Sequence, residues 1–480
     1  MKLLKNMAYN SFYQVLLVIL PLITAPYISR VLGADNIGIN AIVSSVNTYF
    51  VLLCGLGINL YGNREIAYHQ NNKEERSKIF YELLVLKAIM FFISGTLFLI
   101  MVSLQRKWQI FYLVQGLSIV NVFFDVSWFF MGLEKYKIIV LRNTAIQILM
   151  LVCIFIFVKQ PGDLVKYIFL LAGAPLLGSL SIWPLLRREL VPAVWPKFSN
   201  IWQHFKLTAV LFLPQVAISV YVTTNKTILG ALSGVTQTGY FYQSYVIVST
   251  TLGLIGGLNS ALLPHLANLF SEQEHAKIEA LTQKIMQVNL AFSILLASGI
   301  IGVSSTFAVF FFGSSFQEAG KLLLIFPVNI VIISISSVIG SQFLLATKKN
   351  KEFAFSVFLG LFVSIPLNFI FISSFDALGA VIALIATELS VTLSQLFFVR
   401  KAFHLRQLLA GFWKYVLAGA CTVSVLLYLN TTISPSLVDY LFQAIVGCAV
   451  YVGLIFVLRA PFIQVMRPFI GEYMGHLKRR

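Results

Sequence analysis

The stretch FAFSVFLGLFVSIPLNFIFISSF, residues 353–375, decides the fold class of this chain. Its 23 residues include no charged side chain, and a helix of about 20 apolar residues crosses the roughly 30 Å hydrocarbon core of a bilayer. Similar runs recur along the whole sequence. These apolar runs predict about 14 membrane spans. Their centres lie near residues 19, 49, 93, 121, 149, 176, 218, 251, 296, 332, 364, 388, 420 and 448.

The composition supports the same fold class. Of 480 residues, 58% are hydrophobic and 11% are charged, whereas soluble domains carry about 25% charged residues. The sequence therefore predicts an all-α polytopic membrane protein and excludes a soluble enzyme. We attribute the net charge of +17 to membrane topology and expect no nucleic-acid partner. The four cysteines and six histidines lack metal-ligand spacing, so we expect no metal site.

The basic residues are distributed unevenly among the loops. With the N-terminus placed inside, 27 of the 35 Lys and Arg residues fall in the cytoplasmic connections and tails, and 6 fall in the outside connections. Cytoplasmic loops of membrane proteins carry an excess of Lys and Arg. The bias predicts that both termini are cytoplasmic and that the number of spans is even.

The chain also repeats itself. The repeated motifs are residues 30–34 (RVLGA) and 227–231 (TILGA), residues 131–137 (MGLEKYK) and 345–351 (LATKKNK), and Asp163 with Arg187 and Arg188 against Asp376 with Arg400 and Lys401. Because each repeat holds six spans, an even number, the two copies should have the same orientation about an axis normal to the membrane. The predicted parts are a six-helix lobe at 1–186, a linker at 187–206, a second six-helix lobe at 207–400, and two further spans with a basic tail at 401–480.

The linker cannot cross a membrane. Phe198, Ile201, Trp202 and Phe205 lie near helical spacing, and basic residues are interleaved among them. This pattern suits either a short helix on the anionic inner leaflet or a cytoplasmic segment that only ties the lobes together.

Two stretches carry a resemblance to a known family. Residues 26–39 (PYISRVLGADNIGI) and 129–137 (FFMGLEKYK) resemble Wzx-type flippases of lipid-linked oligosaccharides, within the multidrug/oligosaccharidyl-lipid/polysaccharide exporter superfamily. The resemblance extends over essentially the whole chain. These stretches distinguish this branch from drug exporters better than they identify a sugar.

The resemblance implies a fold and an activity. It implies two six-helix lobes in a V around a central cavity, in the bacterial cytoplasmic membrane. It implies transfer of an undecaprenyl-diphosphate-linked O-antigen, capsular or exopolysaccharide repeat unit to the outer leaflet by alternating access, without enzymatic chemistry or a cofactor. Expected partners are the lipid-linked oligosaccharide, membrane lipids and a polysaccharide polymerase or other assembly proteins.

Charges inside a span are costly, so each is a candidate site residue. Arg30 closes the first predicted span, and Lys226, preceded by Asn225, has the adjacent repeat-equivalent place in the seventh. Arginine binds phosphate oxygens bidentately and lysine acts as a point charge, which suits a diphosphate near the outer mouth. The alternative is that these cations snorkel to the headgroups.

Two carboxylates also lie within predicted spans. Asp125 and Glu388 are each surrounded by apolar residues. Either could exchange H⁺ or Na⁺ and couple export to an ion gradient. The alternative is a contact between helices, such as an ion pair with Arg142.

Further charges gather at predicted cytoplasmic ends of spans. Arg64 and Arg142 lie where a lipid diphosphate would first be met, although ordinary topology-determining cations have the same pattern. We expect Lys87 and Glu82 to lie within snorkelling reach of the end of the third span, and we assign them no role.

Two rival functions differ in sequence features. A membrane polymerase or ligase normally has a large outer loop with Arg, His or Asp residues, but the outside connections here are short and hold no His or carboxylate cluster. A multidrug exporter of the same superfamily should have an acidic, aromatic cavity, and the cations Arg30 and Lys226 argue against one.

Overall fold

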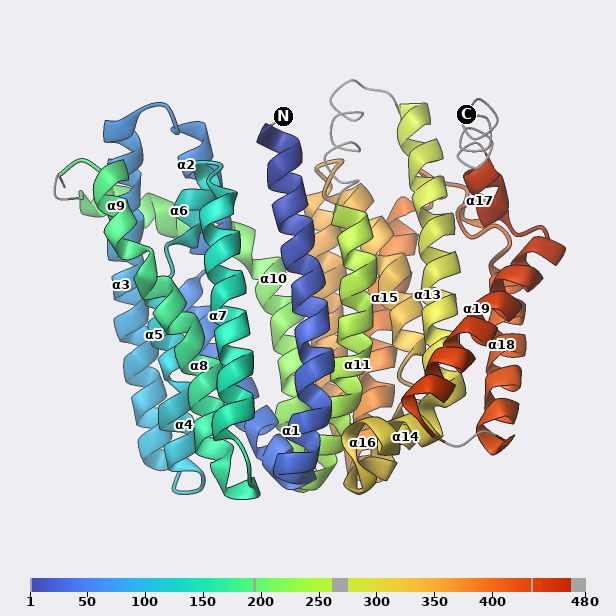
Figure 1. Cartoon of the computed structure of the whole chain (residues 1–480). Helices are drawn as coiled ribbons and strands as arrows, with labels where there is room; N and C mark the ends of the chain where they lie inside the picture. The colour runs from blue at the N-terminus through green and yellow to red at the C-terminus, as the bar shows by residue number, and fades with distance from the viewer. Residues whose placement is uncertain (1, 193–195, 261–274, 433–434, 468–480) are drawn as a thin grey trace, which may run out of the picture. The chain divides into compact units, whose positions relative to one another are not determined.

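The computed structural model describes residues 2–192, 196–260, 275–432 and 435–467 of the chain. This part is built from helices and turns and contains no β-strand (Figure 1). The contacts within the chain divide it into two units, Met1–Gly239 and Tyr240–Arg480. The all-α membrane fold class predicted from the sequence is confirmed.

The first unit holds most of the numbered helices. They are α1 (Lys2–Gly55), α2 (Ile58–Tyr68), α3 (Lys73–Leu104), α4 (Gln109–Gln115), α5 (Leu117–Phe124), α6 (Ser127–Gly132), α7 (Tyr136–Phe157), α8 (Leu164–Ser181), α9 (Trp183–Glu189) and α10 (Phe198–Leu232). Helices α7 and α8 pack side by side, and α10 packs on α1 and α3. Helix α11 (Gly234–Ser260) begins in this unit and ends in the second.

The second unit continues with long helices. They are α13 (His275–Phe312), α14 (Gln317–Leu322), α15 (Val328–Ser336), α16 (Asn350–Val399), α17 (Leu405–Leu408), α18 (Phe412–Thr432) and α19 (Leu437–Val457). A π-helical stretch, Ser337–Leu344, extends α15. Helices α15 and α18 both pack on α13, and the core of this unit includes Leu290, Val338 and Tyr415.

Nine helices in the described residues are long and apolar enough to cross a membrane, or ten if the bent helix α10 counts as one span. Two are too long for one crossing, since 50 residues extend roughly 75 Å. Backbone breaks divide them, at Gly33 (φ 76°, ψ 171°) in α1 and at Asp376 (φ 50°, ψ −128°) in α16. The multi-pass architecture is therefore established, and the count of 14 stays a prediction.

Close backbone contacts join α1 to α10 and α11. A Cβ atom added to Gly38 would lie 1.8 Å from the Val235 carbonyl oxygen, and one added to Gly239 would lie 2.1 Å from the Ala34 carbonyl oxygen. Only glycine fits at these two positions. The second arm of α1, residues 34–55, is thereby fixed against the end of α10 and the start of α11.

Helix α10 begins within the segment predicted as the linker. Its first part, Phe198–Ala209, is bent by 53° from Phe212–Leu232. Ile201 is buried in the core of the first unit, whereas Phe198 and Trp202 are 74% and 50% exposed. One face of this segment therefore packs on protein and the other is open. The predicted lobe and linker bounds stay predictions, and residues 193–195 of the linker lie outside the described residues.

Candidate functional site

A break between two helices organises the polar side chains inside the first unit. Helix α5 ends at Phe124 and α6 begins at Ser127, with Asp125 in an extended conformation between them. The Asp125 carboxylate accepts hydrogen bonds from the backbone N–H of Ser127 at 3.0 Å and from the Ser127 hydroxyl. A side-chain acceptor at this position satisfies an N–H group that has no partner within the helix. The Asp125 carboxylate, one residue before the N-cap Val126, therefore binds the first residue of α6.

Side chains from α3 and α9 satisfy the carbonyl groups that the break leaves open. The Lys87 ammonium donates to the Asp125 carbonyl oxygen, and the Trp183 indole N–H donates to that of Phe124 at 2.8 Å. Lys87 is 1% exposed. The expectation that Lys87 snorkels to the membrane surface is wrong, because its ammonium has a carbonyl partner inside the unit.

Arg142 connects the break to the neighbouring helices. Its guanidinium donates to the Ser127 hydroxyl at 3.0 Å and to the Gly178 carbonyl oxygen in α8 at 3.3 Å. Asp125 and Arg142 are thus linked through Ser127, which is the contact between helices given above as the alternative to ion coupling. We call Lys87, Asp125, Ser127 and Arg142 the α5–α6 cluster.

A second group surrounds a buried carboxylate on α3. Glu82 is 3% exposed and accepts from the Asn200 amide at 2.6 Å, while His204 Nε2 lies 2.9 Å from its other oxygen. His204 Nδ1 lies 2.8 Å from the Tyr61 hydroxyl. The imidazole of His204 therefore bridges the Glu82 carboxylate and the Tyr61 hydroxyl. The expectation that Glu82 snorkels is also wrong, because the carboxylate anchors the first part of α10.

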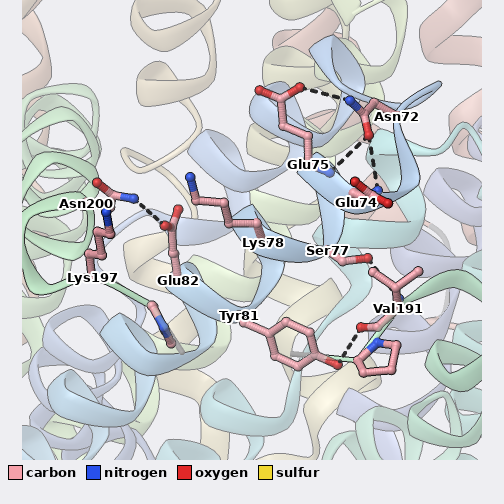
Figure 2. A pocket seen from close by; sticks show the side chains of 12 residues that line it. Asn72, Glu74, Glu75, Ser77, Lys78, Tyr81, Glu82, Val191, Lys197 and Asn200 are labelled. Atoms are coloured by element: carbon pink, nitrogen blue, oxygen red, sulfur yellow. Dashed lines mark hydrogen bonds between the residues drawn. The ribbon is translucent and has the colours of Figure 1, made fainter. Parts of the chain in front are cut away.

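A cavity of about 850 Å³ opens beside this carboxylate. Figure 2 shows Lys78 and Lys197 near Glu82, with Asn72, Glu74 and Glu75 at the start of α3. Its lining carries both signs of charge, so it has no clear preference for an anion.

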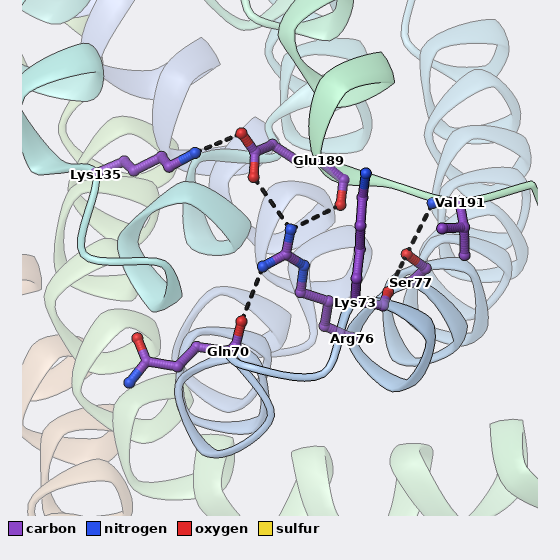
Figure 3. Close-up of polar contacts among 7 residues, drawn as sticks. All are labelled: Gln70, Lys73, Arg76, Ser77, Lys135, Glu189 and Val191. Atoms are coloured by element: carbon purple, nitrogen blue, oxygen red, sulfur yellow. Dashed lines mark hydrogen bonds and ion pairs between the residues drawn. The ribbon is translucent and has the colours of Figure 1, made fainter.

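Glu189 neutralises the cations at the same end of α3. Arg76 donates to the Glu189 carboxylate at 3.2 Å and to its carbonyl oxygen at 3.0 Å, and Lys135 forms an ion pair with the other carboxylate oxygen (Figure 3). Arg76 also donates to the Gln70 carbonyl oxygen at 2.8 Å. The ion pairs connect α3, the α6–α7 turn and α9.

Arg64 remains an accessible cation. Its side chain is 44% exposed, with its guanidinium 3.6 Å from the Glu65 carboxylate and 5.6 Å from the centre of the Tyr61 ring. Arg64 is therefore accessible enough to make the first contact with a diphosphate that the sequence predicts. Arg142 is held in the α5–α6 cluster instead.

Arg30 and Lys226 lie near the same end of the first unit at different depths. Arg30 is exposed and precedes the Gly33 break by three residues, about 5 Å along the helix. Lys226 precedes the turn at Gly234 by eight residues, about 12 Å. That they face one another stays a prediction.

The neighbours of Lys226 are polar. The Tyr49 hydroxyl lies 2.9 Å from the Thr224 hydroxyl and 3.5 Å from that of Thr227, and Asn225 is fully buried. Gly230, which matches Gly33 in the repeated motif, is helical and packs against Ile42. The motif therefore breaks the helix in one copy only.

Glu388 lies inside the second unit. It is 5% exposed on α16 and is not an isolated charge. Among the residues that the structure describes, no group of three or more His, Cys, Asp or Glu side chains is arranged to hold a metal ion.

The fold is shared with known transporters. A structure titled "Lipid II flippase MurJ, inward closed conformation" aligns with a TM-score of 0.75 at 16% identity, covering 97% of this chain and 100% of that one. An inward-facing multidrug resistance MATE transporter of the MOP superfamily aligns with a TM-score of 0.65 at 15% identity, covering 82% of this chain and 97% of its own. At these identities the likeness shows the fold alone.

Sequence comparison identifies the family. A protein named "Putative O-antigen transporter" from Escherichia coli K12 is 26% identical over 408 residues, 83% of this chain and 97% of its own length. A protein of the same name from Shigella dysenteriae is 24% identical over 380 residues, 78% of this chain and 94% of its own. The family model described as "Polysaccharide biosynthesis protein" matches residues 3–270. Since that match covers more than half of the chain, this multi-pass membrane protein belongs to the polysaccharide biosynthesis protein family.

Proposed function

We propose that this protein is a flippase for an undecaprenyl-diphosphate-linked oligosaccharide repeat unit. It would move the repeat unit from the inner to the outer leaflet of the bacterial cytoplasmic membrane by alternating access. The observation that carries the proposal is the match to two relatives named as O-antigen transporters over 94% and 97% of their lengths. The fold likeness to a lipid II flippase supports a lipid-linked cargo.

The charges of the first unit favour an anionic cargo. Arg30 and Lys226 lie within its helices, and a diphosphate entering a low-dielectric path needs compensating positive charge. The same cations would repel the organic cations that suit an acidic, aromatic site. This difference favours the flippase over a multidrug exporter.

The proposal also covers the coupling of export to an ion gradient, the orientation of the termini and the fate of the product. Of the two carboxylates predicted to exchange H⁺ or Na⁺, Glu388 is the stronger candidate, because the Asp125 carboxylate is hydrogen-bonded to Ser127 at the start of α6. Both termini would be cytoplasmic, as the basic bias of the loops predicts. The product would pass to a polysaccharide polymerase on the outer side.

Complementation tests the proposal. A strain that lacks its own flippase for a matched repeat unit receives the parent chain, Arg30→Ala, Arg30→Lys, Lys226→Ala or Lys226→Arg at equal membrane levels. The parent should restore surface polysaccharide, the alanine variants should lose it, and the conservative variants should retain part of it. Failure of the parent would refute the proposed function, whereas full export by both alanine variants would refute only the role of these cations.

A further inference from the structure

A largely apolar groove runs between the two arms of α16 in the second unit. Its volume is about 820 Å³. Phe355, Leu393 and Phe397 line it and are 57%, 56% and 53% exposed. The groove extends from Lys351 to Leu359 along one arm, roughly 12 Å. Its shape and lining suit the part of a hydrocarbon chain that lies next to a lipid headgroup.

One end of this groove is basic. Lys351 lines it in the first turn of α16, and the Arg400 guanidinium lies 3.8 Å from the centre of the Phe397 ring. Within the described ranges, no carboxylate lies within ion-pair distance of Lys351 or Arg400, although Glu352 also lines the groove.

The sequence repeat shows one difference in charge between the two units near this end. In the first unit the corresponding basic end contains Lys135, which is neutralised by Glu189. The residue that matches Lys135 is Lys349, and the residue that matches Glu189 at the offset of 213 is Ala402. The second unit therefore keeps the cations of the repeat and lacks the acid, while the groove beside them is apolar.

We propose that this groove binds an anionic phospholipid of the surrounding membrane, with one acyl chain along Phe355, Leu393 and Phe397 and the phosphate between Lys351 and Arg400. The open lining makes the groove accessible from the bilayer, where such lipids are abundant. Arginine binds a phosphate bidentately and lysine adds a point charge. The proposal goes beyond the flippase activity and does not depend on it.

Native mass spectrometry of the full-length protein in non-ionic detergent tests the site. The protein is titrated with dioleoylphosphatidylglycerol or dioleoylphosphatidylcholine, which share their acyl chains. The parent should bind phosphatidylglycerol more tightly. The double variant Lys351→Ala/Arg400→Ala should weaken that binding about 25-fold, since each cation near an anionic headgroup contributes about fivefold, and should leave phosphatidylcholine binding unchanged.

Matched variants separate the groove from general surface charge. Lys321→Ala removes a 66% exposed lysine elsewhere in the unit and should leave both lipids bound as before. Leu393→Trp fills the groove with both cations intact and should weaken both lipids, whereas Leu389→Trp, at an exposed position outside the lining, should not. Each variant must keep the parent's thermal midpoint in detergent.

Two results would overturn the proposal. One is unchanged phosphatidylglycerol affinity in the folded Lys351→Ala/Arg400→Ala protein. The other is displacement of phosphatidylglycerol by an equimolar amount of undecaprenyl phosphate, which would assign the groove to the lipid of the cargo. Neither result bears on whether the protein flips its cargo.

Discussion

Replacing Gly38 with alanine should force α1 away from α10 and α11. The new Cβ atom would lie 1.8 Å from the Val235 carbonyl oxygen, whereas real Cβ contacts are essentially never under 3.0 Å, so the backbones must separate by about 1.2 Å. The reciprocal Gly239 contact with Ala34 would be lost with it. Overpacking of this kind typically costs about 1–3 kcal/mol, and a unit of this size then loses about 2–12 °C in Tm.

The assay is the thermal unfolding midpoint of the purified protein in detergent, with Gly95→Ala as the matched control. Gly95 lies in α3, and an added Cβ atom would meet nothing within 4 Å. Alanine is favoured over glycine in a helix interior by about 1 kcal/mol, so the control should keep or raise the parent's Tm. An unchanged Tm in Gly38→Ala would refute the close contact between α1 and the α10–α11 turn.

Three further outcomes are expected. Lys87→Met should lower the free energy of unfolding by about 1–3 kcal/mol, because it leaves the Asp125 carbonyl oxygen without its donor; equal stability in detergent would show that this contact contributes nothing. Glu189→Ala should destabilise by about 1–3 kcal/mol, because Arg76 is only 13% exposed and loses its carboxylate; a Tm equal to the parent's would contradict the structural role of the ion pair. Glu388→Gln should remove the dependence of transport in vesicles on an imposed H⁺ or Na⁺ gradient, and a retained dependence would exclude Glu388 from coupling.

Hydropathy predicts membrane spans well because crossing length is a property of consecutive residues. The run at residues 353–375 becomes the first arm of α16. Hydropathy does not identify the breaks within a span. The segment centred near residue 121 divides into α5 and α6 at Asp125, and the available sequence signal was the capping preference of an aspartate two residues before Ser127.

Partners of buried charges are less predictable than spans. Lys87 and Glu82 both lie near a predicted span end, and their distance from that end favours snorkelling. Their actual partners, the Asp125 carbonyl oxygen and the side chains of Asn200 and His204, are 38 to 122 residues away in sequence. Such contacts depend on which helix faces meet, and one sequence does not specify that.

The flippase proposal is tested most directly by the leaflet in which the lipid-linked repeat unit is found. Inner-membrane vesicles are prepared right side out from a strain that lacks its own flippase, with and without this protein, and the repeat unit is labelled with a membrane-impermeant probe. We predict that labelling rises when the parent chain is present and falls to background with Arg30→Ala/Lys226→Ala at equal protein levels. Labelling that is the same with and without the parent chain would contradict the claim that this protein moves lipid-linked oligosaccharides.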